Sequence, residues 1–281
     1  MKNITLKRLL IYLGLSFGIT WAVFFLFILT GNTWTGSSNE MISFISLAML
    51  VPTIAHVLTR LITHEKMKLA GEDSMMLGIH LGNRRGIFYL IAIFLPIVYG
   101  TLSDAILILC DPGIFDPEGV TVFYAIAIPL ISIVSGVILS FAAFGEEFGW
   151  RAYMMPKLIE LMGMPRAVIV GGIVWGLWHA PLTCVGHNFG MDYPGFPVVG
   201  ILLMCLMCTA MGTVLTYVTV KSGSVWPAAF MHAVNNAGAS CLAVFLRGDI
   251  DHPIWVSALC LIPIVICGII FFFLLPKSRK S

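Results

Sequence analysis

Eight apolar runs of membrane-spanning length divide this chain, and they constrain its fold more than any other feature. They lie at about residues 9–30, 41–62, 87–110, 121–145, 167–185, 197–220, 224–246 and 254–275. A helix needs roughly 20 apolar residues to cross a bilayer. Of the 281 residues, 59% are hydrophobic and only 11% are charged, whereas soluble domains have about 25% charged residues. The sequence therefore predicts an all-α membrane protein of about eight transmembrane helices, with residues 1–281 forming a single polytopic membrane domain.

The basic residues indicate how these helices are oriented. If the eight runs cross the membrane in turn, 15 of the 16 Lys and Arg residues fall on one side, and Arg247 is the exception. The 15 are Lys2, Lys7, Arg8, Arg60, Lys66, Lys68, Arg84, Arg85, Arg151, Lys157, Arg166, Lys221, Lys277, Arg279 and Lys280. Retained positive charge marks the cytoplasmic face. Both termini are therefore predicted to be cytoplasmic, while the net charge of +2 gives no indication of a nucleic-acid partner.

Two patterns bear on how the helices pack. Gly172 and Gly176 form a G-x-x-x-G motif, which allows a second helix to approach closely. Cys205 and Cys208 form a C-x-x-C pair without a second pair nearby, and we interpret them as small packing residues. The odd total of seven cysteines does not predict a disulfide framework.

Polar side chains gather in three of the predicted spans, where each ionised group costs about 2.5–3.5 kcal/mol on insertion scales. The three segments are Phe144–Arg151, Trp175–Pro181 and Trp226–Asn236. Their polar members are Glu146, Glu147, Arg151, His179, His232 and Asn236. Because such residues are expensive inside a membrane, the cluster predicts a functional site.

Helical spacing assigns different surroundings to the two carboxylates. Glu147 and Arg151 are four residues apart, so they are expected to pair on one helix face. Glu146 points about 100° away from Glu147 and stays free to face another group. The structural alternative is that Glu147 and Arg151 only fix the end of the helix.

The two histidines add groups that can move or donate protons. His179 lies two residues before Pro181, which cannot continue the backbone ladder, so carbonyl groups a turn earlier are expected to open. His232 and Asn236 project from one face of their helix. A carboxylate and an imidazole together can activate water, and donors such as His232 and Asn236 can stabilise an oxyanion by roughly 3–4 kcal/mol each. The set predicts a peptide-bond hydrolase, although each histidine alone would more often be a packing residue.

In these three ordered motifs the chain resembles the CAAX-protease and bacteriocin-processing family of intramembrane glutamic proteases. That family includes the Ras-converting prenyl endopeptidases and the abortive-infection proteins. The motifs are Glu146-Glu147-x-x-x-Arg151, an aromatic-x-x-x-His motif ending at His179, and His232-x-x-x-Asn236. The resemblance covers roughly residues 121–245, so the catalytic helices are expected at about 121–246.

The resemblance implies an eight-helix fold with the site in a membrane cavity open to the cytosol. It implies that Glu146 and His179 activate water while His232 and Asn236 stabilise the oxyanion. The supporting residues would be Glu147, Arg151 and Trp175. Trp175 is a departure, because the family usually has Phe at this position.

Other hydrolase motifs are weaker here. His64-Glu65 is followed by Lys-Met-Lys, so H-E-x-x-H is absent, and Asp104 has no partner in a G-x-G-D motif. Gly14-x-Ser16-x-Gly18 matches G-x-S-x-G but lies in a continuous apolar helix without the strand-to-helix turn that exposes such a serine. His56 and Asp104 remain without a predicted role.

A zinc ion is a further alternative. The side chains that could bind zinc are those of Glu146, Glu147, His179 and His232. Arg151 and Asn236 are better suited to a metal-free site, so no cofactor is predicted.

The depth of the three motifs raises a geometric difficulty. With Arg151 and Arg166 at the cytoplasmic rim and every helix upright, Glu146 would lie about 7 Å deep, His232 about 12 Å and His179 about 20 Å. The three side chains would then not meet. Tilts of up to about 40°, or a start of the helix at 167–185 below the membrane surface, would bring them closer.

The sequence thus predicts an intramembrane endopeptidase acting on a membrane-bound or lipidated peptide, prenylated or not. The alternative is a non-catalytic immunity or assembly protein of the same fold. A transporter is less favoured, because no inverted repeats with matching broken helices are evident. The predicted partners are the substrate peptide and the lipid bilayer, and the oligomeric state is open. The absence of a glycosylation sequon in the predicted outer loops favours a prokaryotic cell membrane.

Overall fold

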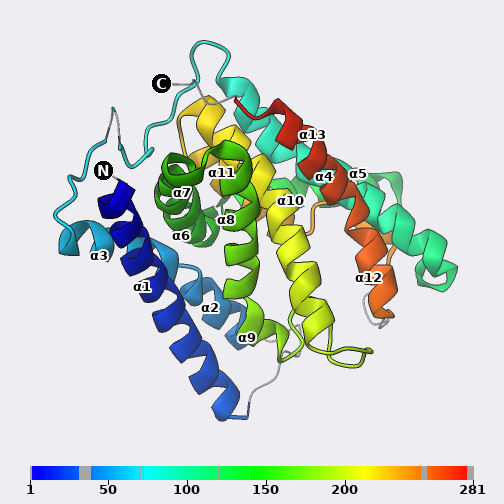
Figure 1. Cartoon of the computed structure of the whole chain (residues 1–281). Coiled ribbons are helices and arrows are strands. Elements are labelled where there is room, and N and C mark those ends of the chain that lie inside the picture. Colours follow the sequence, from blue (N-terminus) through cyan, green and yellow to red (C-terminus); the bar gives the residue numbers. More distant parts are fainter. Residues whose placement is uncertain are drawn as a thin grey trace.

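The computed structural model describes residues 2–31, 39–69, 71, 73–118, 120–138, 140–247 and 252–276. Lys277, Arg279 and Lys280, which belong to the basic residues counted above, lie outside the described residues. The described chain is a bundle of helices, and its only strand-like pairing is an isolated bridge between Phe115 and Leu246. The described chain begins and ends at one end of the bundle, here named the terminal end, and the short helix α9 (Ala180–Thr183) lies at the opposite, far end (Figure 1). The prediction of an all-α protein is confirmed.

Within the described residues, five helices are long and apolar enough to cross a membrane. They are α1 (Lys2–Leu29), the Phe44–Ile62 span formed by α2 (Asn39–Ala48) and α3 (Val51–Ile62), α4 (Gly86–Cys110), α10 (Val198–Ser222), and the Ile254–Leu274 span formed by α12 (Ile254–Cys260) and α13 (Ile262–Leu274). A sixth results if α5 (Val122–Ile138) and the helix that follows it, bent by 55°, count as one span. The expected spans at 167–185 and 224–246 contain shorter helices, α8 (Met164–Trp178) and α11 (Trp226–Asn236).

The helix that carries the two carboxylates extends beyond the end of its predicted span at residue 145. It runs through α6 (Ser140–Gly149), a π-helical segment (Trp150–Met154) and α7 (Met155–Met162). Arg151 is only 4% exposed, and the helix continues beyond it to Met162. A helix can continue through these charges because Glu147 neutralises Arg151 within it. Glu146 therefore lies about 24 Å from the helix end at Met162, and His179 about 22 Å from the start of α8 at Met164. This similarity in depth removes most of the difficulty noted above.

The helix predicted over 224–246 ends early, at Asn236. Gly238 has a φ of +63°, the left-handed conformation that commonly follows a helix C-terminus. The non-helical chain beyond it packs closely on α4, where a Cβ on Gly100 would lie 2.7 Å from the Ala239 carbonyl oxygen. Irregular backbone at membrane depth is tolerated where protein covers it. This packing provides such cover.

The close helix packing predicted from G-x-x-x-G is confirmed, and α10 is the partner of α8. A Cβ on Gly172 would lie 2.3 Å from the Cα of Thr209, and one on Gly176 would lie 2.5 Å from the Cα of Cys205. No side chain fits at either glycine. The seven cysteines are all free, as expected.

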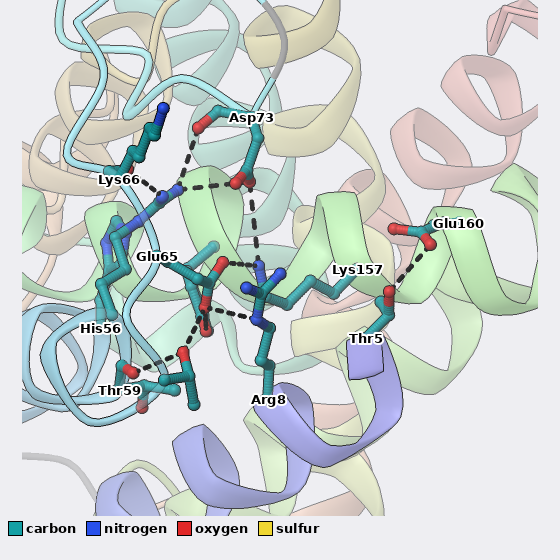
Figure 2. Close-up of polar contacts among 12 residues, drawn as sticks. Thr5, Arg8, His56, Thr59, Glu65, Lys66, Asp73, Lys157 and Glu160 are labelled. Atoms are coloured by element: carbon teal, nitrogen blue, oxygen red, sulfur yellow. Dashed lines mark hydrogen bonds and ion pairs between the residues drawn. The ribbon is translucent and has the colours of Figure 1, made fainter. Parts of the chain in front are cut away.

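A buried ionic cluster joins three elements at the terminal end, as Figure 2 shows. Glu65, in the segment after α3, accepts hydrogen bonds from Lys157 Nζ of α7 at 2.8 Å and from the Tyr153 hydroxyl at 2.5 Å. Arg8 of α1 lies 3.5 Å from the same carboxylate. We name Arg8, Glu65, Tyr153 and Lys157 the Glu65 cluster. It holds α1, the 63–85 segment and α7 together.

His56, unassigned from the sequence, connects this region with the helix of the carboxylates. Its Nδ1 lies 2.9 Å from the Phe148 carbonyl oxygen, and its Nε2 accepts a hydrogen bond from Arg60 Nε at 2.8 Å. Because Arg60 can only donate, the Nδ1 of His56 carries the proton and donates to Phe148. The contact fixes α3 against the turn that follows Glu146 and Glu147.

We expect Glu65→Gln to lower the free energy of unfolding by about 3 kcal/mol at neutral pH, because Lys157 would remain buried without its anion. Burial by itself would raise the pKa of Glu65, but hydrogen bonds from Lys157 and Tyr153 and the charges of Lys157 and Arg8 hold it below its usual value. The stabilisation is therefore present above the unfolded-state pKa of about 4.3 and is lost as the pH falls through the folded-state pKa. Thermal unfolding in detergent between pH 7 and pH 3 measures this.

Wild-type protein should lose stability over this acid range more steeply than Glu65→Gln. Equal slopes for the two proteins would contradict the role given to the carboxylate. Glu118→Gln, which alters an exposed carboxylate, is the matched control and should follow the wild type.

Candidate active site

A cavity of about 710 Å³ lies among the helices and collects the predicted polar residues. Its polar lining comes from α2, α6, α11 and α12, from the end of α8 and from the segments at the far end. These residues are Ser46, Glu146, His179, His187, Asn188, His232, Asn235, Asn236, His252 and Ser257. Four methionines contribute to its apolar lining: Met49, Met204, Met207 and Met211. We refer to this cavity as the chamber.

Glu146 is held by two indole groups. Its Oε2 accepts hydrogen bonds from Trp175 Nε1 of α8 at 2.7 Å and from Trp150 Nε1 at 3.3 Å. The residue is only 2% exposed and still lines the chamber. Both bonds use Oε2, so Oε1 is left for a further donor. The tryptophan that departs from the resembled family's Phe thus supplies a hydrogen bond that a phenyl ring could not.

Glu147 contacts two basic side chains instead of one. Its Oε1 accepts a hydrogen bond from Arg151 Nη1 at 3.1 Å, which confirms the pairing predicted from their spacing. The same oxygen lies 2.8 Å from Nδ1 of His232 on α11. The Arg151 guanidinium also stacks over the Trp175 ring at 4.1 Å. Glu147 therefore orients His232 across two helices.

His179 lies at the point where α8 ends, two residues before Pro181. Its Nδ1 is 2.9 Å from the Trp175 carbonyl oxygen, and the Trp178 carbonyl, also near the helix end, accepts a hydrogen bond from Trp21. A carbonyl can only accept, so Nδ1 of His179 donates and Nε2 keeps a free lone pair in the neutral ring. The end of the helix thus presents a basic nitrogen beside the chamber.

The structure brings Glu146, His179 and His232 to one chamber, with Trp175 between the histidines. The Trp175 ring centroid is 5.4 Å from that of His232 and 6.0 Å from that of His179. Asn236 also lines the chamber, but it lies at its exposed margin, where its Oδ1 accepts from Asn235 at 3.2 Å. No hydrogen bond between Asn236 and the other predicted site residues is found in the described chain.

Three contacts were not predicted from the sequence. They are the hydrogen bond from Trp150 to Glu146, the contact between His232 and Glu147, and the hydrogen bond from Tyr99 to Asn235 at 2.7 Å. The spacing of Trp150 four residues after Glu146 was a usable signal. The other two join separate helices, and sequence spacing carries no information about them. As for metals, the described residues include no group of three or more His, Cys, Asp or Glu side chains placed to bind an ion.

Comparison with known proteins shows a similarity over part of the chain. The model of the family described as type II CAAX prenyl endopeptidase Rce1-like matches residues 127–238, which include every predicted site residue. This segment of the chain is similar to the Rce1-like family. A relative, CAAX prenyl protease 2 of the archaeon Methanococcus maripaludis, is 31% identical over 108 residues. That match covers 38% of this chain and 40% of the archaeal protein.

The Rce1-like family comprises CAAX prenyl endopeptidases, which are intramembrane proteases. The several long apolar helices of this chain are consistent with a multi-pass integral membrane protein. The shared segment runs from α5 to the end of α11, so α1 to α4, α12 and α13 lie outside it.

Proposed function

We propose that this protein is an intramembrane endopeptidase that hydrolyses a peptide bond in a membrane-associated protein or peptide, of the prenylated CAAX type or unlipidated. The observation that carries the proposal is the meeting of Glu146, His179 and His232 in one chamber inside the family segment. A carboxylate, a neutral imidazole and a second, carboxylate-oriented imidazole provide the groups that amide hydrolysis needs.

In the proposed mechanism, Glu146 and His179 activate a water molecule. The water molecule donates hydrogen bonds to the free Oε1 of Glu146 and to the lone pair on Nε2 of His179. One of these two bases takes a proton from the water as the water oxygen bonds to the carbonyl carbon of the substrate. The carbonyl π electrons move to oxygen and form an oxyanion. When the oxyanion collapses, the C–N bond breaks and the proton held by the site passes to the leaving amine. The charges and atoms balance without another reactant.

His232 and Asn236 are proposed to stabilise the oxyanion. The Glu147 carboxylate can only accept, so Nδ1 of His232 donates to it. As an imidazolium, His232 can then donate from Nε2 to the oxyanion. Asn236 retains its Nδ2 donors, because its recorded contact uses Oδ1. The supporting residues Glu147, Arg151 and Trp175 hold these groups in place.

The architecture we propose counts α8 and α11 as short spans, which gives eight in all with both termini in the cytoplasm. Residues 1–281 then form one polytopic domain, with the catalytic helices at about 121–246. We propose a prokaryotic cell membrane as its location. The charge distribution of the sequence and the common position of both ends of the described chain at the terminal end support this orientation.

The proposal is tested with detergent-purified protein and two peptides, one with a farnesylated C-terminus and one hydrophobic but unlipidated. Wild type should cleave at least one, and both Glu146→Ala and His179→Ala should abolish that cleavage. Comparison of the two peptides shows whether the lipid is required. If folded wild type cleaves neither, or if both variants remain active, the proposed function is wrong and a binding or immunity role becomes the better interpretation.

Trp175→Phe is expected to lower kcat about tenfold with little change in stability. Phenylalanine keeps the ring that packs between the histidines but removes the 2.7 Å hydrogen bond to Glu146, and such bonds to charged groups contribute roughly 1.5–3 kcal/mol. Steady-state cleavage measures kcat and KM separately. Trp226→Phe, which removes an indole hydrogen bond to the Leu77 carbonyl away from the chamber, is the control and should keep wild-type kcat.

We propose that the reaction needs no metal, since Glu147 is already paired with Arg151 and a cation beside a metal site is unfavourable. Treatment with a strong zinc chelator followed by gel filtration should leave the cleavage rate unchanged. Loss of activity that added zinc restores would contradict this part of the mechanism.

A further inference from the structure

Asn236 occupies a weakly supported position in the site. It is the last residue of α11, and the last turn of a helix has backbone carbonyls without partners inside the helix. The chain leaves the helix at once, with Gly238 in the left-handed conformation. The side chain is exposed at the margin of the chamber. A hydrogen-bond donor in such a place needs support from outside its own helix, because oxyanion stabilisation depends on donors that are already oriented.

Two hydrogen bonds supply this support from α4. The Tyr99 hydroxyl donates to Oδ1 of Asn235 at 2.7 Å. Nδ2 of Asn235 then donates to Oδ1 of Asn236 at 3.2 Å. We name Tyr99, Asn235 and Asn236 the Tyr99 network. It connects a side chain of α4, which lies outside the three sequence motifs, with the amide that ends the third motif.

The backbone around the Tyr99 network is fixed by packing on two sides. Two residues after Tyr99, the Thr101 hydroxyl accepts a hydrogen bond from the Cys241 backbone amide at 2.9 Å, which holds the chain that follows α11 on α4. On α5, a Cβ on Gly136 would lie 2.9 Å from the Cα of Val234, so α5 and α11 are in close contact. The end of α11 therefore has a defined position relative to Tyr99.

The direction of the two hydrogen bonds decides how the Asn236 amide is turned. Tyr99 is only 6% exposed, and a buried hydroxyl hydrogen needs an acceptor, which Oδ1 of Asn235 provides. The NH2 group of Asn235 is then turned to Asn236, where it has to meet an oxygen. The Asn236 Oδ1 is occupied by this contact. The NH2 group of Asn236 stays available to the chamber that the residue lines.

His232, the other donor of the proposed site, is oriented in a comparable way. Its Nδ1 is held by Glu147, which in turn is paired with Arg151. The Oδ1 of Asn236 is held by Asn235, which in turn is bonded to Tyr99. In both cases a supporting side chain occupies one polar atom and leaves the other free to donate.

We propose that Tyr99 and Asn235 are positioning residues that turn the NH2 group of Asn236 towards the oxyanion formed during peptide hydrolysis. Tyr99 acts through Asn235, and Asn235 acts through Asn236. This inference rests on the proposed function, because it adds two residues to the stabilisation of the oxyanion in that reaction.

The first test measures cleavage by Tyr99→Phe and Asn235→Leu, which keep the size of each side chain and remove its hydrogen bonds. Each should lower kcat about fivefold, within the usual contribution of one hydrogen bond. KM should change little, because the oxyanion is absent from the bound substrate. Tyr124→Phe, which alters an exposed tyrosine of α5, is the matched control and should keep wild-type kcat.

The same substitutions in an Asn236→Ala background separate positioning from general packing. Asn236→Ala alone should lower kcat about 10²-fold, as expected for the loss of an oxyanion donor. Adding Tyr99→Phe should lower it no further, because the group that Tyr99 positions is already gone. An equal fivefold loss in both backgrounds would overturn the proposal, since Tyr99 would then act independently of Asn236.

NMR of protein labelled with ¹⁵N in the asparagine side-chain amides tests the network without cleavage. Asn236→Ala and Asn235→Leu identify the two amide signals in detergent. Tyr99→Phe should shift both signals, and Tyr124→Phe should shift neither. An unchanged Asn236 signal in Tyr99→Phe would overturn the proposal. If wild type cleaves neither test peptide, the proposed function fails together with the oxyanion role, whereas the NMR comparison still decides whether Tyr99 orients Asn236.

Discussion

Glu146→Gln is expected to lower kcat/KM for peptide cleavage by about 10²–10⁴-fold, the usual contribution of a general base. Glutamine has the same shape, and its amide oxygen can still accept the hydrogen bonds from Trp175 and Trp150. The fold should therefore remain, and only the ability to take a proton is lost. The measurement pairs the cleavage rate with the melting temperature in detergent, which should change little.

A variant of the neighbouring carboxylate, Glu147, distinguishes a catalytic role from a positioning role. Glu147→Gln keeps an acceptor for Arg151 and His232 but removes the charge that balances them. We expect it to reduce both the cleavage rate and the stability, because Arg151 is left buried without its anion. If Glu147→Gln instead stayed folded but inactive while Glu146→Gln kept activity within tenfold of wild type, the roles assigned to the two carboxylates would be reversed.

Gly172→Leu is expected to prevent stable folding. The first atom of any side chain at this position would lie 2.3 Å from the Cα of Thr209, so α8 and α10 would have to separate. Overpacking commonly costs about 1–3 kcal/mol when side chains can adjust, and here the obstructing atom belongs to the backbone. We expect loss of most monodisperse protein after detergent extraction, measured by size-exclusion chromatography.

The matched control is Gly14→Leu, a change in another transmembrane helix. No atom lies within 4 Å of the position that a Cβ on Gly14 would occupy, so α1 can accept the side chain. Its yield and melting temperature should match those of wild type. Similar behaviour of the two variants would show that the contact at Gly172 does not control assembly.

Features set by local spacing could be predicted from the sequence. The pairing of Glu147 with Arg151 follows from a separation of four residues, and the contact of α8 with another helix follows from Gly172 and Gly176. The opening of carbonyl groups near His179 to side-chain donors follows from the missing amide hydrogen of Pro181. Each of these depends on residues within one helix, where the geometry is fixed.

Features that depend on where a helix ends were harder to predict from the sequence. The predicted depths of Glu146 and His179 differed because Arg151 was taken as the end of its helix, whereas the helix continues to Met162 with that charge neutralised inside it. The end of α11 had a local signal, since Gly238 follows Asn-Asn-Ala and is suited to a C-cap, but the apolar residues beyond it concealed the break. The contact between His232 and Glu147 joins two helices and had no local signal.

The π-helical segment Trp150–Met154 determines how the two ends of one helix are turned relative to each other. Each residue of an α-helix advances the direction of its side chain by about 100°, and a π turn includes one extra residue. With it, Glu147 points to His232 on one side of the segment, and Lys157 points to Glu65 on the other. A chain with one residue fewer here could keep the ionic contact of Glu147 or that of Lys157, but not both. The segment thus sets the angle between the part of the helix that faces the chamber and the part that contacts the Glu65 cluster. A rotation of one part about the helix axis is coupled to a rotation of the other.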